Sequence, residues 1–207
     1  MTSQASAPNR RIAFNEFIVL MLKPIRWRWL LAPPLLLALE FLYVIFTETY
    51  GAHIKGILDD AALYILWAAL VIALGRALIQ RQAFLVWLSV LIGALLFREY
   101  HLMKIATGIT YAIMVGLIIA AWLNYEVFQP YLRSSLTVTL LVVVGLTYVL
   151  TQTLDIDFFK YGDKANTIVE ELMELTGHLM TVMLAILARP SKIETTSDAK
   201  APPVTES

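Results

Sequence analysis

The sequence predicts an all-α integral membrane protein, a bundle of about six transmembrane helices preceded by a helix that lies along the membrane surface. Three observations lead to this fold class. Of the 207 residues, 59% are hydrophobic and only 15% are charged, whereas ordinary globular domains carry about 25% charged residues. The mean hydropathy is +0.71. The apolar residues form six long segments, and the basic residues lie mainly in connections that six crossings would put on one side.

Each of the six segments supplies roughly 17–22 mostly apolar residues, enough to cross a hydrocarbon layer of about 30 Å at 1.5 Å per residue. The predicted spans are residues 29–47, 58–79, 82–100, 105–124, 134–154 and 167–188. Pro33 and Pro34 fall in the opening turns of the first span, where a missing backbone donor costs least.

The segment before the first span is too short to cross a membrane. It is apolar over residues 11–22, is stopped by Lys23 and Pro24, and continues into alternating Arg and Trp residues at 26–29. This composition is typical of a membrane–water boundary. We therefore expect an interfacial amphipathic helix over residues 10–28, a transmembrane domain over 29–189, and disordered tails at 1–9 and 190–207.

The basic residues predict the orientation. Six crossings leave both chain ends on one side. That side collects eleven of the sixteen Lys and Arg residues, since only Lys55, Arg98, Lys104, Lys160 and Lys164 fall on the other side. The positive-inside rule then predicts a cytoplasmic (inner) membrane with both termini in the cytoplasm. The formal net charge of zero predicts no nucleic-acid partner. Membrane lipids and another membrane protein are the expected partners. The absence of cysteine excludes thiol chemistry.

Acidic residues and histidines gather in the non-cytoplasmic half of the predicted bundle, at the outer ends of several spans. Ionisable groups in a membrane are costly and usually face a partner or a water-filled cavity. The candidate polar cluster comprises Asp59, Asp60, Glu99, His101, Asp155, Asp157, Glu171, Glu174 and His178.

The last span carries the deepest of these groups. Glu171, Glu174 and His178 share one helix face, because they are three and four residues apart. Counted from residue 167, Glu174 lies about 10 Å and His178 about 16 Å into the span. For the pairs at 59–60 and 170–171 an alternative is capping of a helix start. Glu40 is similarly deep, and His178 and Arg76 are its candidate partners, although Arg76 is more readily explained by snorkelling to the cytoplasmic boundary.

These residue types leave three functions open, and no catalytic residue is assigned. The first is an interaction or binding site formed by the cluster; as a structural alternative, its acids would fix helix packing by pairing with Arg98, Lys104, Lys160 or Lys164. The second is a metal-dependent membrane hydrolase acting on a lipid, in which His101, Glu174 and His178, with carboxylates such as Asp60, would hold a divalent metal and activate water. The third is a proton-coupled carrier. No nucleotide-binding, nucleophile-elbow or His-Glu-x-x-His motif occurs.

Three segments resemble uncharacterised bacterial multipass inner-membrane proteins. They are the Asp59-Asp60 pair, the stretch LFREYHLMK at residues 96–104, and the Asp155 region followed by Glu170-Glu171-x-x-Glu174. The resemblance implies a location in a bacterial membrane and brings no activity with it.

Overall fold

The computed structural model describes residues 12–47, 52–100, 106–155 and 163–191, and these residues form helices and contain no strand. The elements are α1 (Phe14–Leu22), the 3-10 helix η1 (Trp27–Leu31), α2 (Ala32–Thr47), α3 (Ala52–Gln80), α4 (Ala83–Glu99), α5 (Ala106–Leu123), α6 (Tyr125–Leu132), α7 (Ser135–Asp155) and α8 (Asp163–Leu187). The predicted all-α class is confirmed for this part of the chain. The tails predicted to be disordered lie almost wholly outside it.

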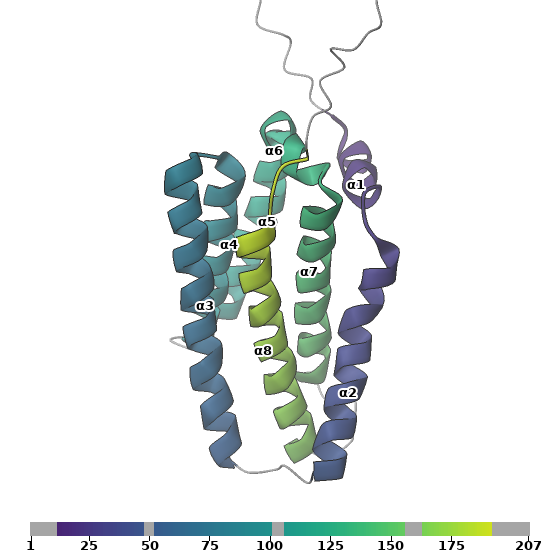
Figure 1. Cartoon of the computed structure of the whole chain (residues 1–207), viewed down its shortest axis with the longest axis vertical. Helices are drawn as coiled ribbons and strands as arrows, with labels where there is room; N and C mark the ends of the chain where they lie inside the picture. Colours follow the sequence, from purple (N-terminus) through teal and green to yellow (C-terminus); the bar gives the residue numbers. More distant parts are fainter. Residues whose placement is uncertain (1–11, 48–51, 101–105, 156–162, 192–207) are drawn as a thin grey trace, which may run out of the picture.

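Helix α8 makes the most extensive helix–helix contacts in the described part of the chain. It packs most extensively on α3 and α7, and next on α2. In Figure 1 these long helices run side by side along the long axis, while α1 and α6 cover one end. The residue pattern explains the position of α8, because polar residues at 171, 174 and 178 and apolar residues such as Val169, Met173 and Leu184 are all buried or half-buried there.

Both described ends of the chain lie at the end of the bundle formed by α5 and α6. The indole Nε1 of Trp122 donates to the carbonyl oxygen of Ile12 at 3.0 Å. The backbone amide of Ser191 donates to the carbonyl oxygen of Pro130 at 2.7 Å. We call this the terminal end of the bundle, and the opposite end, formed by the start of α3 and the start of α8, the far end.

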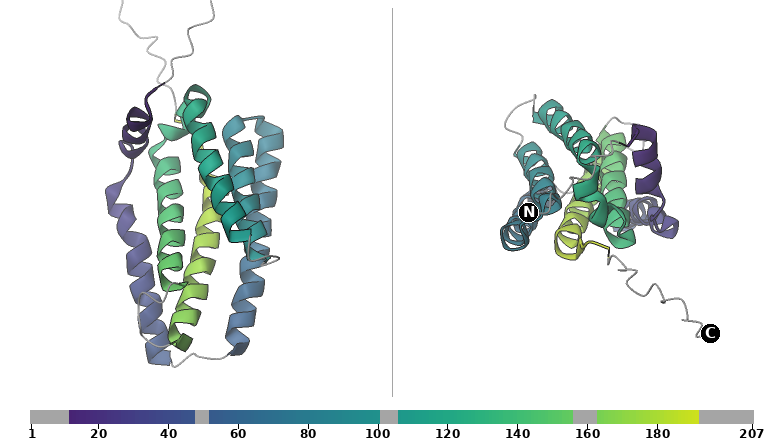
Figure 2. Two further views of the ribbon diagram at one scale, coloured as in Figure 1. Left: turned by 180° about the vertical axis from the view of Figure 1, so that it is seen from behind. Right: turned by 90° about the horizontal axis from the view of Figure 1, so that it is seen from above.

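The α4–α5 hairpin is short. Helix α4 has 17 residues and α3 has 29, which correspond to about 26 Å and about 44 Å at 1.5 Å per residue. Seen from behind, the hairpin therefore ends part way along α3 (Figure 2). The last residues of α4 consequently lie beside the middle of α8, not beside its start.

Aromatic side chains hold the terminal end together. The ring of Phe84, 1% exposed, stacks on Tyr131 with centroids 4.1 Å apart and on Trp87 at 5.6 Å. The ring of Phe17 on α1 meets Tyr125 on α6 edge-on at 6.0 Å. Helix α1 is thus packed onto the bundle through a buried aromatic residue.

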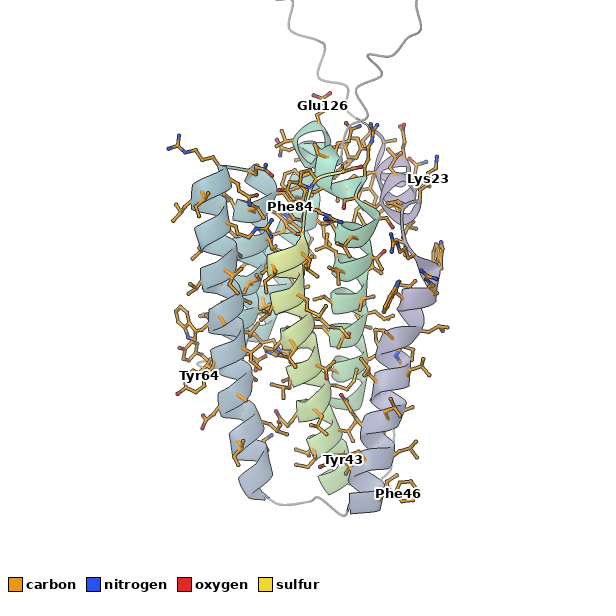
Figure 3. All side chains as sticks on the ribbon, viewed as in Figure 1. Lys23, Tyr43, Phe46, Tyr64, Phe84 and Glu126 are labelled. Atoms are coloured by element: carbon orange, nitrogen blue, oxygen red, sulfur yellow. The ribbon has the colours of Figure 1, made fainter. Side chains whose placement is uncertain are left out.

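Bulky apolar side chains point outward from the long helices of the bundle. Tyr64 and Phe46 are 73% and 81% exposed, and both extend away from the bundle in Figure 3. Among the described residues, Trp27–Phe46 and Lys55–Gln80 are long and apolar enough to cross a membrane. A third candidate is Gly108–Leu123 together with Tyr125–Leu132, bent by 98°. The structure therefore carries two to three candidate spans by length and composition.

Two helices begin earlier than the apolar patterns predicted. Helix α3 starts at Ala52 and α8 at Asp163, so the acidic pairs at 59–60 and 170–171 lie about two turns inside these helices. The interpretation of these four carboxylates as helix-start caps is therefore wrong. Both helices extend beyond their apolar portions. A capping residue has to lie at the end of the hydrogen-bonded helix, and the edge of an apolar run does not mark that end.

Candidate functional site

The end of α4 and the middle of α8 form an ion pair. Arg98 occupies the last turn of α4, and its Nη2 lies 2.5 Å from Oε1 of Glu174. The side chains are 16% and 9% exposed. A carboxylate in such a position requires a partner, because burial of a lone charge is strongly unfavourable. The short α4–α5 hairpin brings that partner to the depth of Glu174.

His178 is fully buried one turn further along α8. Its Nδ1 is hydrogen-bonded to the backbone carbonyl oxygen of Glu174. A carbonyl oxygen can only accept, so Nδ1 carries the proton in the neutral ring and Nε2 presents a lone pair. Nε2 lies 3.5 Å from Oε1 of Glu99 and has no hydrogen-bond partner among the described residues. An imidazole acceptor therefore faces a carboxylate oxygen.

Gly177 allows α7 to approach the buried histidine closely. A Cβ atom at Gly177 would lie 3.4 Å from Cγ2 of Thr147 and 3.5 Å from Cζ of Tyr148. The ring of Tyr148 in turn packs edge-on against the imidazole of His178, with centroids 5.7 Å apart. The close neighbour that Gly177 permits is therefore the residue that packs against the histidine ring.

A second ion pair lies one turn towards the far end. Nζ of Lys55 is 2.6 Å from Oε1 of Glu171, with side-chain exposures of 45% and 12%. The carboxylate of Asp59, one turn along α3 from Lys55, attracts the ammonium group of Lys55 electrostatically. Along α8 the polar side chains at 171, 174 and 178 thus become progressively less exposed, so they form a row that leads inward from the far end.

The row of polar side chains on α8 does not continue to the terminal end of the helix. Thr181 donates to the carbonyl oxygen of Gly177 at 2.8 Å, and the following seven residues of the chain, 182–188, have apolar side chains. This apolar stretch is about 10 Å long. Arg76, which faces it, donates to the carbonyl oxygens of Ala185, of Ile186 at 3.0 Å and of Ala188 at 2.6 Å.

The predicted cluster is assembled in part. Glu99, Glu174 and His178 come together, Glu171 lies one turn away, Asp59 acts on its ion pair, and Asp60 is exposed on α3. His101, Asp157 and the side chain of Asp155 lie outside the described residues. No group of three or more His, Asp or Glu side chains in the described ranges could hold a metal ion.

Two contacts were not predicted. His178 and Arg76 were the predicted partners of Glu40, but the hydroxyl of Thr176 donates to Oε1 of Glu40 at 2.9 Å. Arg76 was expected to snorkel to the membrane boundary, which stays a prediction, and its guanidinium binds the last carbonyls of α8. The last turn of a helix has unpaired carbonyl oxygens, which attract a nearby cation.

Arg98 and Glu174 form an ion pair, and beside them Nε2 of His178 lies 3.5 Å from Oε1 of Glu99. A proton placed between these two atoms would join them in a hydrogen bond. Comparison of the chain with protein-family models, with curated proteins and with solved structures finds no match.

Proposed function

We propose that this chain is a multipass protein of a cytoplasmic membrane, and that its acid/histidine cluster is a binding site for one proton that enters from the non-cytoplasmic side. In this proposal six helices cross the membrane, α1 lies at the interface, and both termini are cytoplasmic. The far end of the bundle is then the non-cytoplasmic end, towards which the row of polar residues on α8 opens.

The observation that carries the proposal is the contact between Nε2 of His178 and Oε1 of Glu99, 3.5 Å apart. Two acceptors in a buried site repel each other unless a proton lies between them. A proton on Nε2 would give the buried ring nitrogen of His178 a hydrogen-bond partner.

The charge balance of the site agrees with this. Arg98 contributes +1, Glu99 and Glu174 contribute −1 each, and a neutral His178 contributes nothing, so these four residues sum to −1. One bound proton brings the sum to zero. Because uncompensated charge is unfavourable away from water, the four-residue site favours the singly protonated state.

Six crossings are compatible with the charges on α8. A span is ordinarily recognised by low charge, but charges that neutralise each other in pairs cost less to bury than isolated ones. The glutamates at 171 and 174 are bound to Lys55 and Arg98, and Arg76 is bound to carbonyls. This pairing supports counting α8 as a span, with α4, α5 and α7 beside it.

The apolar stretch beyond Thr181 favours binding over transport. A proton carrier needs polar groups along its whole path. Over residues 182–188 α8 offers none, and the buried hydroxyl of Ser89 on α4 donates to its own helix at Leu85, at 2.8 Å. A lipid hydrolase has no comparable support in the described residues.

The test is the pH dependence of thermal unfolding of the full chain in mild detergent. His53 and His101 are replaced by Gln, so that His178 is the remaining histidine. We expect the Tm of this variant to depend on the pH, because the folded state holds one proton at the shared site that the unfolded state lacks.

Glu99→Gln in the same background is the decisive comparison. The amide of Gln can donate to Nε2, so we expect a higher Tm at pH 8 and a flattened pH profile. Glu16→Gln, on the exposed face of α1, should keep the original profile. Equal pH profiles for Glu99→Gln and its parent would rule out the shared proton.

A further inference from the structure

A second feature of the bundle is an apolar cavity of about 270 Å³ between the α4–α5 hairpin and α7. Helix α1 borders it at the terminal end through Phe17 and Met21, and Trp87, Met114, Gly145 and Tyr148 are among its other lining residues. The ring of Tyr148 lines the cavity and also packs on the imidazole of His178.

The packing of the hairpin explains the cavity. Helix α4 packs mainly on α3, and α5 mainly on α4, while α6 bridges from the hairpin to α7. The hairpin therefore joins α7 chiefly at the terminal end, where α6 and the aromatic cluster around Phe84 close the structure. Along the rest of their length the facing surfaces stay apart.

The lining of this cavity determines what can fill it. The lining residues are hydrophobic or aromatic apart from Gly145, so a water molecule inside would lack the two to four hydrogen-bond partners that hold buried water. An empty cavity of this size leaves its lining atoms without contacts. A flexible hydrocarbon chain satisfies the lining without requiring a polar partner. In a membrane the abundant molecule of this kind is a lipid.

The charges near α1 indicate which lipid. The segment that follows the cavity-lining Met21 carries Lys23 and Arg26, and both side chains are exposed. Lys23 projects from the terminal end in Figure 3. Cations at this position complement an anionic headgroup at the membrane surface, while Phe17 and Met21 lead from that surface into the cavity.

We propose that the cavity holds one acyl chain of an anionic phospholipid whose headgroup lies against Lys23 and Arg26. This proposal rests on the membrane location proposed above, with α1 at the interface. It does not depend on the proton site.

The experiment uses the full chain in phosphatidylcholine nanodiscs that contain a trace of phosphatidylglycerol with a diazirine at the middle of one acyl chain. Cross-linked residues are identified by mass spectrometry. We expect labelling of Met114 and of other cavity residues. Gly145→Leu should abolish this labelling, because a Cβ atom at Gly145 has no neighbour within 4 Å and a larger side chain enters the cavity.

Gly116→Leu is the matched control. Gly116 is a helical glycine with equally free surroundings, but it is exposed on α5 and does not line the cavity. This variant should keep the labelling of Met114. Lys23→Gln should reduce it for the phosphatidylglycerol probe, and a phosphatidylcholine probe should label the cavity less than phosphatidylglycerol does in the unmodified chain.

The proposal is overturned if labelling is confined to outward residues such as Tyr64, or if both headgroups label the cavity equally. Glu99→Gln separates the two proposals, because it removes the proton site and should leave the lipid labelling intact. A chain that shows no labelling anywhere, including at Tyr64 and Phe46, would instead contradict the membrane location on which both proposals rest.

Discussion

Arg98 at the end of α4 reaches Glu174 in the middle of α8, with 2.5 Å between Nη2 and Oε1. The residues are 76 positions apart in sequence, and the contact exists because the α4–α5 hairpin stops part way along the bundle. The contact joins the end of α4 to the middle of α8, and it gives the buried carboxylate of Glu174 a positively charged partner.

Removal of one partner of this pair should cost much more than removal of both. We expect Arg98→Gln to lower the free energy of unfolding by about 3 kcal/mol, since it leaves a buried carboxylate without its cation. Arg98→Gln/Glu174→Gln should recover most of this loss. Reversible unfolding in detergent–SDS mixtures measures both. Lys55→Gln is the control, because that half-exposed ion pair should contribute less than about 1 kcal/mol. Additive losses in the double variant would show that the two residues do not interact.

Gly177 should tolerate a methyl group and reject a larger side chain. A Cβ atom there makes ordinary contacts of 3.4 Å and 3.5 Å with Thr147 and Tyr148, so Gly177→Ala should be nearly neutral. Gly177→Leu should destabilise the fold by about 1–3 kcal/mol, because it pushes α7 away from α8. The same unfolding assay decides, with Gly93→Leu as the control, since a Cβ atom at Gly93 has open space. Equal effects of Gly177→Leu and Gly93→Leu would contradict the close contact.

Arg76 should stabilise the end of α8. Arg76→Met keeps much of the aliphatic chain but leaves the carbonyl oxygens of Ala185 and Ala188 without their donor, so we expect a loss of about 1–3 kcal/mol. Hydrogen exchange should increase in the last turn of α8 and not at its start. Arg81→Met is the control, because Arg81 is exposed at the turn after α3. Unchanged exchange in Arg76→Met would mean that the guanidinium is dispensable.

Phe84 should be among the most important apolar residues at the terminal end. It is 1% exposed and stacks between Trp87 and Tyr131, so Phe84→Ala should cost about 3–5 kcal/mol. Phe46→Ala removes the same ring from an 81% exposed position and should have little effect on packing. The difference in Tm between the two variants in detergent tests the assignment, and similar Tm values would argue against a packed aromatic core here.

Single cysteines can test the proposed orientation, since the chain contains none. Cysteine at position 23 or 126, both exposed at the terminal end, should react with a membrane-impermeant maleimide only after the inner membrane is opened. Cysteine at position 55, at the far end, should react in intact spheroplasts. The reverse pattern would invert the orientation, and reaction of both ends in intact spheroplasts would exclude it.

The sequence alone was sufficient to predict that the chain is helical and which face of α8 is buried in the bundle. The three- and four-residue spacing of Glu171, Glu174 and His178 defines one side of a helix whatever surrounds it, and all three are buried or half-buried in the bundle. Apolar length likewise indicated helices. These properties are local, so a single sequence carries them.

The sequence could not indicate how far one helix is displaced along another. The choice of Arg98 as partner for Glu174 depends on where the α4–α5 hairpin ends relative to α8, and periodicity contains no such information. The same limitation hid the binding of Arg76 to carbonyls, because backbone acceptors leave no pattern of residue types. The starts of α3 and α8 were misplaced for a different reason, since the hydropathy pattern marks the apolar part of a helix and not its hydrogen-bonded length.

Arg76 also has a mechanical consequence. Its guanidinium fastens α3 to the last turn of α8 at the terminal end, while at the other end the two helices are joined through the half-exposed Lys55–Glu171 contact. The two ends of the α3–α8 contact therefore differ in how far solvent reaches the groups that join them. Salt screens an exposed ion pair more than hydrogen bonds to buried backbone, so loosening of this helix pair should begin at the far end.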